Sequence, residues 1–94
     1  MNKYFKYDLT NSEGNKFVGG GKLDGDWSMQ CRHCSFDDTT DIYLIIGSVY
    51  SIEIYSSDNF EESRSLYNSL FEIFKNTGSY SSSQCRIYAR VWYE

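Results

Sequence analysis

The sequence predicts an α+β fold in which a single helix packs on one face of an antiparallel sheet. One segment has helical periodicity, and several short segments alternate between apolar and polar residues with turn residues between them. A helix and a sheet each bury one apolar face, so the consistent arrangement is a pair of layers. We expect a mostly antiparallel sheet of five or six strands, with one helix over about residues 58–77 on one of its faces.

The helix prediction rests on the spacing of large apolar side chains. They recur at intervals of three, four and seven residues, which places them on one face of a helix: Phe60, Tyr67, Leu70, Phe71 and Phe74. Asp58 can cap the first turn and Glu61 can reach back to it, as in a capping box. Gly78 can then end the helix in the left-handed conformation.

The strand predictions follow the chain on both sides of the helix. Alternation or short apolar runs indicate strands over residues 4–10, 16–21, 27–32, 42–46, 49–55 and 85–93. Polar residues at 11–15 and 24–26, and the pair Gly47-Ser48, predict turns between them. The glycines at 19–21 indicate a bulge or a sheet edge. The Ser-rich residues 79–84 read as a linker.

Length and charge limit the classes of function. The 94 residues predict one domain, 1–94, with one small core. The net charge of −4 repels a phosphate backbone, and the sequence has no run of Lys and Arg to overcome it, so we do not expect direct nucleic-acid binding. The longest apolar run, 42–46, is too short for a membrane span, and the first ten residues do not resemble a signal peptide. We expect a cytoplasmic protein with reduced thiols.

The motif at Cys31–Cys34 is the strongest candidate for a metal site. Two thiolates three residues apart can bind one zinc ion, with Cys85 as a third ligand and His33 or Asp37 as a fourth. A second close pair of ligands is missing, so we favour small buried cysteines and expect no cofactor, with zinc as the alternative. A redox role is disfavoured because the motif leads into an acidic loop and not into a helix.

The acidic loop and the histidine do not predict catalysis. Asp37, Asp38 and Asp41 could hold a hard cation, but the Gly and distal Glu of an EF-hand are absent, so a solvated or partner-binding loop is favoured. His33 is the only histidine, and the nearest thiols are its sequence neighbours, which is poor geometry for a dyad. We therefore do not expect an enzyme.

Exposed aromatic and basic side chains predict a binding face. In the last strand, Arg86, Tyr88, Arg90 and Trp92 alternate with the aliphatic residues and should point away from the helix. Tyr50 is assigned the same direction on its own strand. Trp, Tyr and Arg are the residue types enriched in binding hot spots. Cross-strand pairing or a homodimer contact would account for the same pattern.

Together these features predict a small, acidic, non-enzymatic module that binds a larger protein through its sheet face or its acidic loop. In size and charge the chain is similar to small phage-encoded proteins that block host defence nucleases, the anti-CRISPR type, some of which present an acidic surface in place of DNA. The similarity is one of type, without a shared motif. A phage or mobile-element inhibitor would act in the host cytoplasm. The alternatives are a zinc module built on Cys31, Cys34 and Cys85, and a homodimeric structural protein.

Overall fold

The computed structural model describes residues 1–23, 25–47, 50–82 and 86–94, and these form seven strands and one helix. In chain order the elements are β1 (Lys3–Thr10), β2 (Lys16–Lys22), β3 (Trp27–Cys34), β4 (Thr39–Ile46), β5 (Tyr50–Ser57), α1 (Phe60–Lys75), β6 (Gly78–Ser82) and β7 (Ile87–Tyr93). All strand pairs are antiparallel, so the prediction of an α+β fold with antiparallel strands is confirmed.

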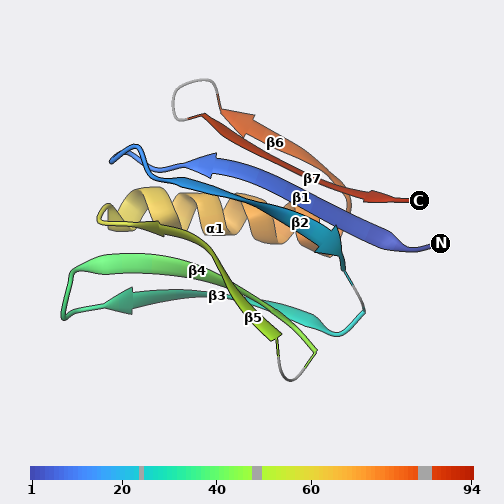
Figure 1. Ribbon diagram of the computed structural model, residues 1–94, viewed down its shortest axis with the longest axis horizontal. Coiled ribbons are helices and arrows are strands. Elements are labelled where there is room, and N and C mark those ends of the chain that lie inside the picture. Colours follow the sequence, from blue (N-terminus) through green and yellow to red (C-terminus); the bar gives the residue numbers. More distant parts are fainter. Residues whose placement is uncertain (24, 48–49, 83–85) are drawn as a thin grey trace.

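The strands form two sheets, and the prediction of one sheet with five or six strands was wrong. The four-stranded sheet has the order β2-β1-β7-β6, and the three-stranded sheet has the order β3-β4-β5 (Figure 1). The edge strands β2 and β5 lie next to each other. Aromatic side chains join these edges, since the rings of Phe17 and Tyr55 lie 5.5 Å apart. The two sheets therefore meet through side-chain packing instead of a backbone ladder.

Two local features explain the difference in strand number and pairing. The register of β4 with β5 shifts at Ile42 and Tyr43, and such a bulge bends and twists a strand away from a flat sheet. The Ser-rich segment predicted as a linker forms β6 over residues 78–82, where Tyr80 pairs with Ala89 of β7 and packs against the core. Residues 83–85, and with them Cys85, lie outside the described part of the chain.

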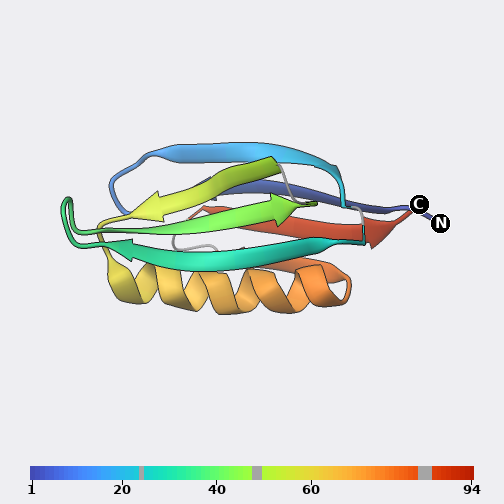
Figure 2. The same ribbon diagram turned by 90° about the horizontal axis from the view of Figure 1, so that it is seen from below.

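Helix α1 covers the inner side of both sheets. Figure 2 shows the helix as a separate layer against the strands, and α1 contacts β3, β4 and β5 of one sheet and β6 and β7 of the other. Its buried residues are Ser63, Leu66, Leu70 and Phe74. Phe74 contacts Phe5 of β1 at 5.4 Å and Trp27 of β3 at 5.9 Å between ring centroids. One core is thus shared by the two sheets.

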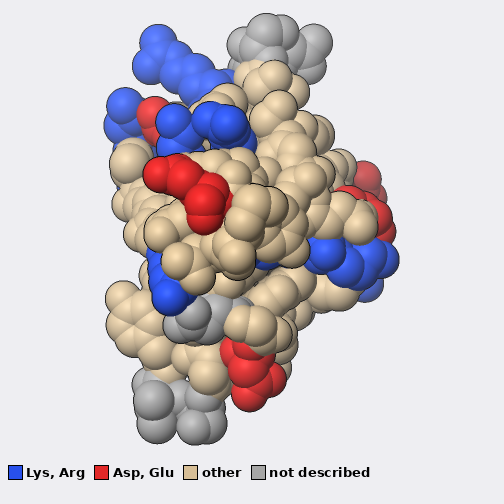
Figure 3. Space-filling model, turned by 90° about the vertical axis from the view of Figure 1, so that its right-hand side faces the viewer, with Lys and Arg blue, Asp and Glu red and all other residues tan. Residues whose placement is uncertain are grey.

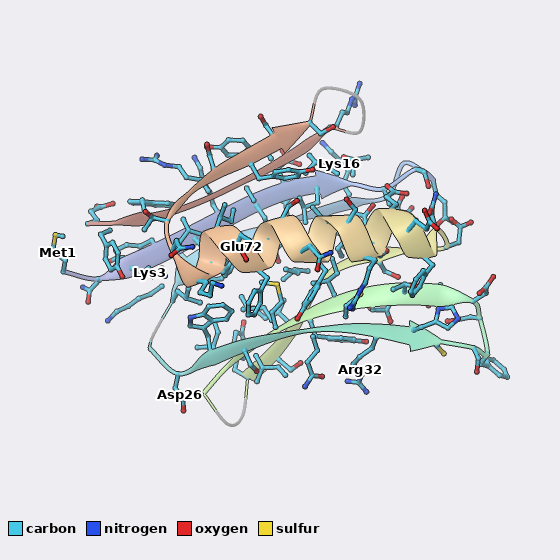
Figure 4. The ribbon with its side chains drawn as sticks, turned by 180° about the vertical axis from the view of Figure 1, so that it is seen from behind. Met1, Lys3, Lys16, Asp26, Arg32 and Glu72 are labelled. Carbon is cyan, nitrogen blue, oxygen red and sulfur yellow. The ribbon has the colours of Figure 1, made fainter. Side chains whose placement is uncertain are left out.

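The helix is shorter at both ends than the predicted range of about 58–77. Asn59, and not Asp58, is the N-cap, because its side-chain oxygen accepts a hydrogen bond of 3.0 Å from the backbone of Glu62. At the other end Asn76 is the C-cap, and Gly78 opens β6. Lys3, labelled in Figure 4, donates from Nζ to the carbonyl oxygen of Phe74 at 2.6 Å. A basic group on the last carbonyls stabilises the negative end of the helix.

The glycines of β2 leave room for aromatic side chains of β1. Gly19 pairs with Tyr7, and a Cβ at Gly19 would lie 2.6 Å from Cζ of the Tyr7 ring. A Cβ at Gly20 would lie 2.7 Å from the carbonyl oxygen of Phe5. Strand β2 is an edge strand, as the glycine run predicted, and the close approach of β1 explains why side chains are missing there.

We expect Gly19→Ala to lower the free energy of unfolding by about 1–3 kcal/mol, the usual cost of overpacking. The Tyr7 ring is only 7% exposed, so it cannot move aside without disturbing the core. Gly25→Ala is the matched control, because a Cβ there meets nothing within 4 Å. Urea denaturation of both variants measures the effect, and equal stability of Gly19→Ala and the unchanged chain would contradict it.

Within the described residues, no helix combines the length and the apolar composition that crossing a bilayer requires.

Candidate functional site

The side of the four-stranded sheet that faces away from α1 is here called the outer face. Along β1 the side chains of Phe5, Tyr7 and Leu9 are buried against the helix side, so those between them point outward. Strands β2 and β7 follow the same alternation in register with β1. The outer face carries Tyr4, Lys6, Asp8, Thr10, Lys16, Val18, Lys22, Tyr88, Arg90 and Trp92, with Arg86 just before β7.

Strand pairing places aromatic rings and cations of the outer face on top of one another. Tyr4 is opposite Trp92, and their ring centroids are 6.0 Å apart with an interplanar angle of 26°. The Arg90 guanidinium lies 4.9 Å from the centre of the Trp92 ring. On the next pair of positions the Lys6 ammonium lies 5.6 Å from the centre of the Tyr88 ring. The rings are therefore held in place by their neighbours, and each cation is attracted electrostatically to the face of the ring next to it.

The outer face is basic although the chain as a whole is acidic. Five basic residues, Lys6, Lys16, Lys22, Arg86 and Arg90, outnumber two acidic ones, Asp8 and Glu94, and Glu94 accepts a hydrogen bond of 2.9 Å from the indole N–H of Trp92. Figure 3 looks at the end of the molecule that holds the termini, where several Lys and Arg side chains lie at the upper left, on the side of this face, with Asp and Glu atoms beside and below them. The grouping cannot be read from the linear sequence, because β7 pairs with β1 from the opposite end of the chain.

A hollow of about 240 Å³ lies at one end of the outer face. Residues of β1, β2, β6 and β7 and the residue before β7 line it: Asp8, Thr10, Lys16, Ser82, Arg86, Ile87 and Tyr88. Thr10 pairs with Lys16, and its Oγ1 is the one buried side-chain oxygen or nitrogen without a hydrogen-bond partner among the described residues. Arg86 has a φ of 51°, a conformation that costs free energy for a residue other than glycine. The hollow thus combines the cations of Lys16 and Arg86 with the carboxylate of Asp8, whereas the Thr10 oxygen that lacks a partner is itself buried.

The structure brings together four of the five residues predicted for the binding face. Arg86, Tyr88 and Arg90 are exposed and Trp92 is half-buried, and all belong to the outer face. Tyr50 does not join them, because it begins β5 in the other sheet and shares its strand face with Ile52, which packs against the core.

Tyr50 instead lies near an inward-facing tyrosine. Burial raises the pKa of Tyr7 above its ordinary value, and the nearby Tyr50 hydroxyl raises it further. The register of β4 with β5 places Tyr50 on the helix side of its own sheet, because Tyr50 pairs with Ile46 and Ile52 pairs with the buried Leu44. The assignment of Tyr50 to the same face as Trp92 was therefore wrong, because the bulge in β5 and the break between the sheets separate the two strands.

The three acidic residues predicted as a loop site have separate structural roles. Asp37 accepts a hydrogen bond of 2.8 Å from the Thr39 hydroxyl, and this bond holds the pKa of Asp37 below its usual value. Asp38 lies in the left-handed region with a φ of 57°, and its carboxylate is 3.5 Å from Nε2 of His33. Asp41 belongs to β4 and accepts a bond of 2.6 Å from the hydroxyl of Ser56. These contacts join the β3–β4 turn to its neighbouring strands, and the side chain of Asp38 stays 85% exposed.

The cysteines of the predicted zinc motif point to opposite faces of β3. Cys31 is half-buried on the helix side, and Cys34, three positions later, is exposed on the other side. Within the described residues, no three His, Cys, Asp or Glu side chains lie close enough together to hold a metal ion. The proposed third ligand, Cys85, is outside the described residues. The zinc site stays a prediction, and the geometry of Cys31 and Cys34 does not favour it.

We expect Cys34→Ser to leave the melting temperature unchanged and protein purified without added metal to contain no zinc. The reason is that the Cys34 side chain is exposed and does not share a face with Cys31. Thermal denaturation and elemental analysis measure the two quantities. One zinc ion per chain, together with a lower melting temperature for Cys34→Ser, would establish the zinc module instead.

Sequence analysis missed the contribution of β1 and β2 to the outer face. Tyr4, Lys6, Lys16 and Lys22 were not among the predicted site residues, although the alternation of residues 4–10 already placed Lys6 on the polar side. What was missing is the pairing of β1 with β7, which sets these residues beside Arg90 and Trp92.

No protein-family model matches the chain, and neither a curated protein nor a solved structure is significantly similar to it.

Proposed function

We propose that this chain is a non-enzymatic module that binds a larger protein through the outer face of its four-stranded sheet. The observation that carries the proposal is the exposure of aromatic and basic side chains on a face that no other described element covers. Trp, Tyr and Arg contribute most to protein interfaces, since they offer large contact areas together with hydrogen-bond donors. On this face all three types are neighbours: Tyr88, Arg90 and Trp92.

The rigidity of the face supports a role in binding. Tyr4 and Trp92 stack across β1 and β7, and Arg90 lies on the Trp92 ring. Side chains that are already ordered lose little conformational entropy when a partner binds, so more of the contact energy appears as affinity. A four-stranded sheet whose other face is filled by a shared core also resists deformation on docking.

The surroundings of His33 support the absence of catalysis. Its Nδ1 lies 3.0 Å from the Thr40 hydroxyl, and its ring meets the Phe60 ring edge-on at 6.0 Å. These contacts join β3, β4 and the start of α1, which is a structural role. A catalytic histidine would need a nucleophile that a substrate can reach, whereas Thr40, whose hydroxyl lies beside this imidazole, is only 1% exposed.

A second observation favours a particular kind of partner, a nuclease of a host defence system. Carboxylates gather at the end of the molecule opposite the termini, where the β1–β2 turn, the β3–β4 turn and the start of α1 lie (Figure 1). Glu13 accepts a 3.4 Å hydrogen bond from the backbone of Asp58, while Glu61 and Glu62 occupy the first helical turn. An acidic end of this kind can enter a basic nucleic-acid channel. In that case the chain is a phage or mobile-element inhibitor acting in the host cytoplasm.

We expect Tyr88→Ala and Trp92→Ala each to weaken partner binding by about 30-fold, the effect of losing a hot-spot side chain worth about 2 kcal/mol. Tyr50→Ala is the matched control, because Tyr50 is an aromatic residue that is 59% exposed at the start of β5, outside both the outer face and the acidic end. Quantitative capture from the native host with each variant, followed by calorimetry on the purified pair, measures the change. Circular dichroism checks that both variants remain folded.

Three outcomes would contradict the proposed docking face. Unchanged capture with both outer-face variants would exclude it. Loss of capture only with Asp37→Asn and Asp38→Asn would move the interface to the acidic end. A solution mass of two chains that falls to one in Tyr88→Ala, without any other partner, would establish the homodimer alternative.

A further inference from the structure

We infer that the partner presents an acidic protein segment to the outer face, and that one of its carboxylates binds in the hollow between Lys16 and Arg86. The inference rests on the proposed function of this face and specifies the chemistry of the partner. It follows from the charge of the face, from the donors that line the hollow, and from the arrangement of cations on the aromatic rings.

The hollow has the donors that a single carboxylate needs. Lys16 lines it from the start of β2 and Arg86 from the residue before β7, and their ammonium and guanidinium groups supply the charged donors. Hydrogen bonds from cations to a carboxylate are shorter and stronger than neutral ones. Asp8 also lines the hollow, and its negative charge offsets part of the positive charge of Lys16 and Arg86. The remaining positive charge suits a singly charged carboxylate better than a doubly charged phosphate.

A second pair of cations lies further along the same face. Lys6 and Arg90 are directly opposite each other on β1 and β7, and they lie over the rings of Tyr88 and Trp92. A guanidinium that rests on a ring keeps its N–H groups at the edge, where a carboxylate can accept two hydrogen bonds. Lys6 and Thr10 are four residues apart on β1, a distance of about 13 Å along a strand. An extended segment with acidic residues four positions apart matches both sites.

The same features favour an acidic protein over a single-stranded nucleic acid. Proteins that bind single strands offer ring faces on which bases stack, whereas here the rings of Tyr88 and Trp92 are covered by Lys6 and Arg90. The chain has a net charge of −4 despite its basic face, so its remaining surface is more acidic still. A phosphate backbone that extends beyond the face would be repelled there.

The test uses two probes of opposite class on the whole protein. An octamer of glutamate and an octamer of thymidine are titrated separately into ¹⁵N-labelled protein at the same ionic strength, and amide shifts report the site and the affinity. We expect the glutamate peptide to shift the amides of Lys16, Arg86 and Arg90, with an affinity that falls as salt is added. The double variant Lys16→Ala/Arg86→Ala should weaken peptide binding by about tenfold or more, the loss of charged hydrogen bonds worth about 1.5 kcal/mol or more.

A charge-matched control separates the site from a general effect of net charge. Arg64→Ala/Lys75→Ala removes the same number of positive charges from α1, on the other side of the molecule, and should leave peptide binding unchanged. Tighter binding of the thymidine octamer than of the peptide would overturn the inference and identify the face as a nucleic-acid surface. Absence of peptide shifts at millimolar concentration would also overturn it.

The inference and the proposed function fail in different ways. If capture of the partner is lost in Trp92→Ala but kept in Lys16→Ala/Arg86→Ala, the face binds protein without using carboxylates, and only the inference fails. If capture is unaffected by Tyr88→Ala and Trp92→Ala, the proposed docking face itself is wrong.

Discussion

The structure depends on the packing of α1 against two sheets that no backbone ladder joins. Phe74 contacts the rings of Phe5 and Trp27, one from each sheet, and Leu70 and Leu66 continue the same buried stripe. Because β2 and β5 meet only through side chains such as Phe17 and Tyr55, the helix is the element that fixes the two sheets relative to each other. The apolar contacts that hold the two sheets together are therefore concentrated on the face of α1 that packs against them.

This constraint determines which surface is available for binding. Every second residue of β1 and β7 is committed to the shared core, and strand geometry sends the others outward. With α1 already packed on the inner side, the described chain has no second helix to cover the outer face. The exposed rings there are stabilised laterally, by Tyr4 against Trp92 and by Lys6 over Tyr88. The face is ordered without being buried, which is a property of pre-formed binding surfaces.

Local features of the sequence were sufficient for the helix and for six of the seven strands, but not for β6 or for the assembly of the sheets. Apolar spacing identified the helix, and alternation gave the inward and outward residues of β7, because both depend on near neighbours in the chain. The N-cap was misplaced by one residue since Asp58 and Asn59 are both good caps and only the backbone geometry chooses. The partner of β1, the break between β2 and β5 and the fate of the Ser-rich segment depend on contacts distant in sequence. The basic cluster was missed for the same reason.

Net charge is a poor guide to what such a small protein binds. At physiological salt the screening length is about 8 Å, whereas the molecule extends 40 Å along its longest axis, so a partner responds to the charge of the surface it approaches. Lys6, Lys16 and Arg90 lie on one face, and the carboxylates of the β3–β4 turn and of the first turn of α1 lie at one end. The two regions attract groups of opposite charge. A partner that touches both is held in one orientation, because turning it would set like charges against each other.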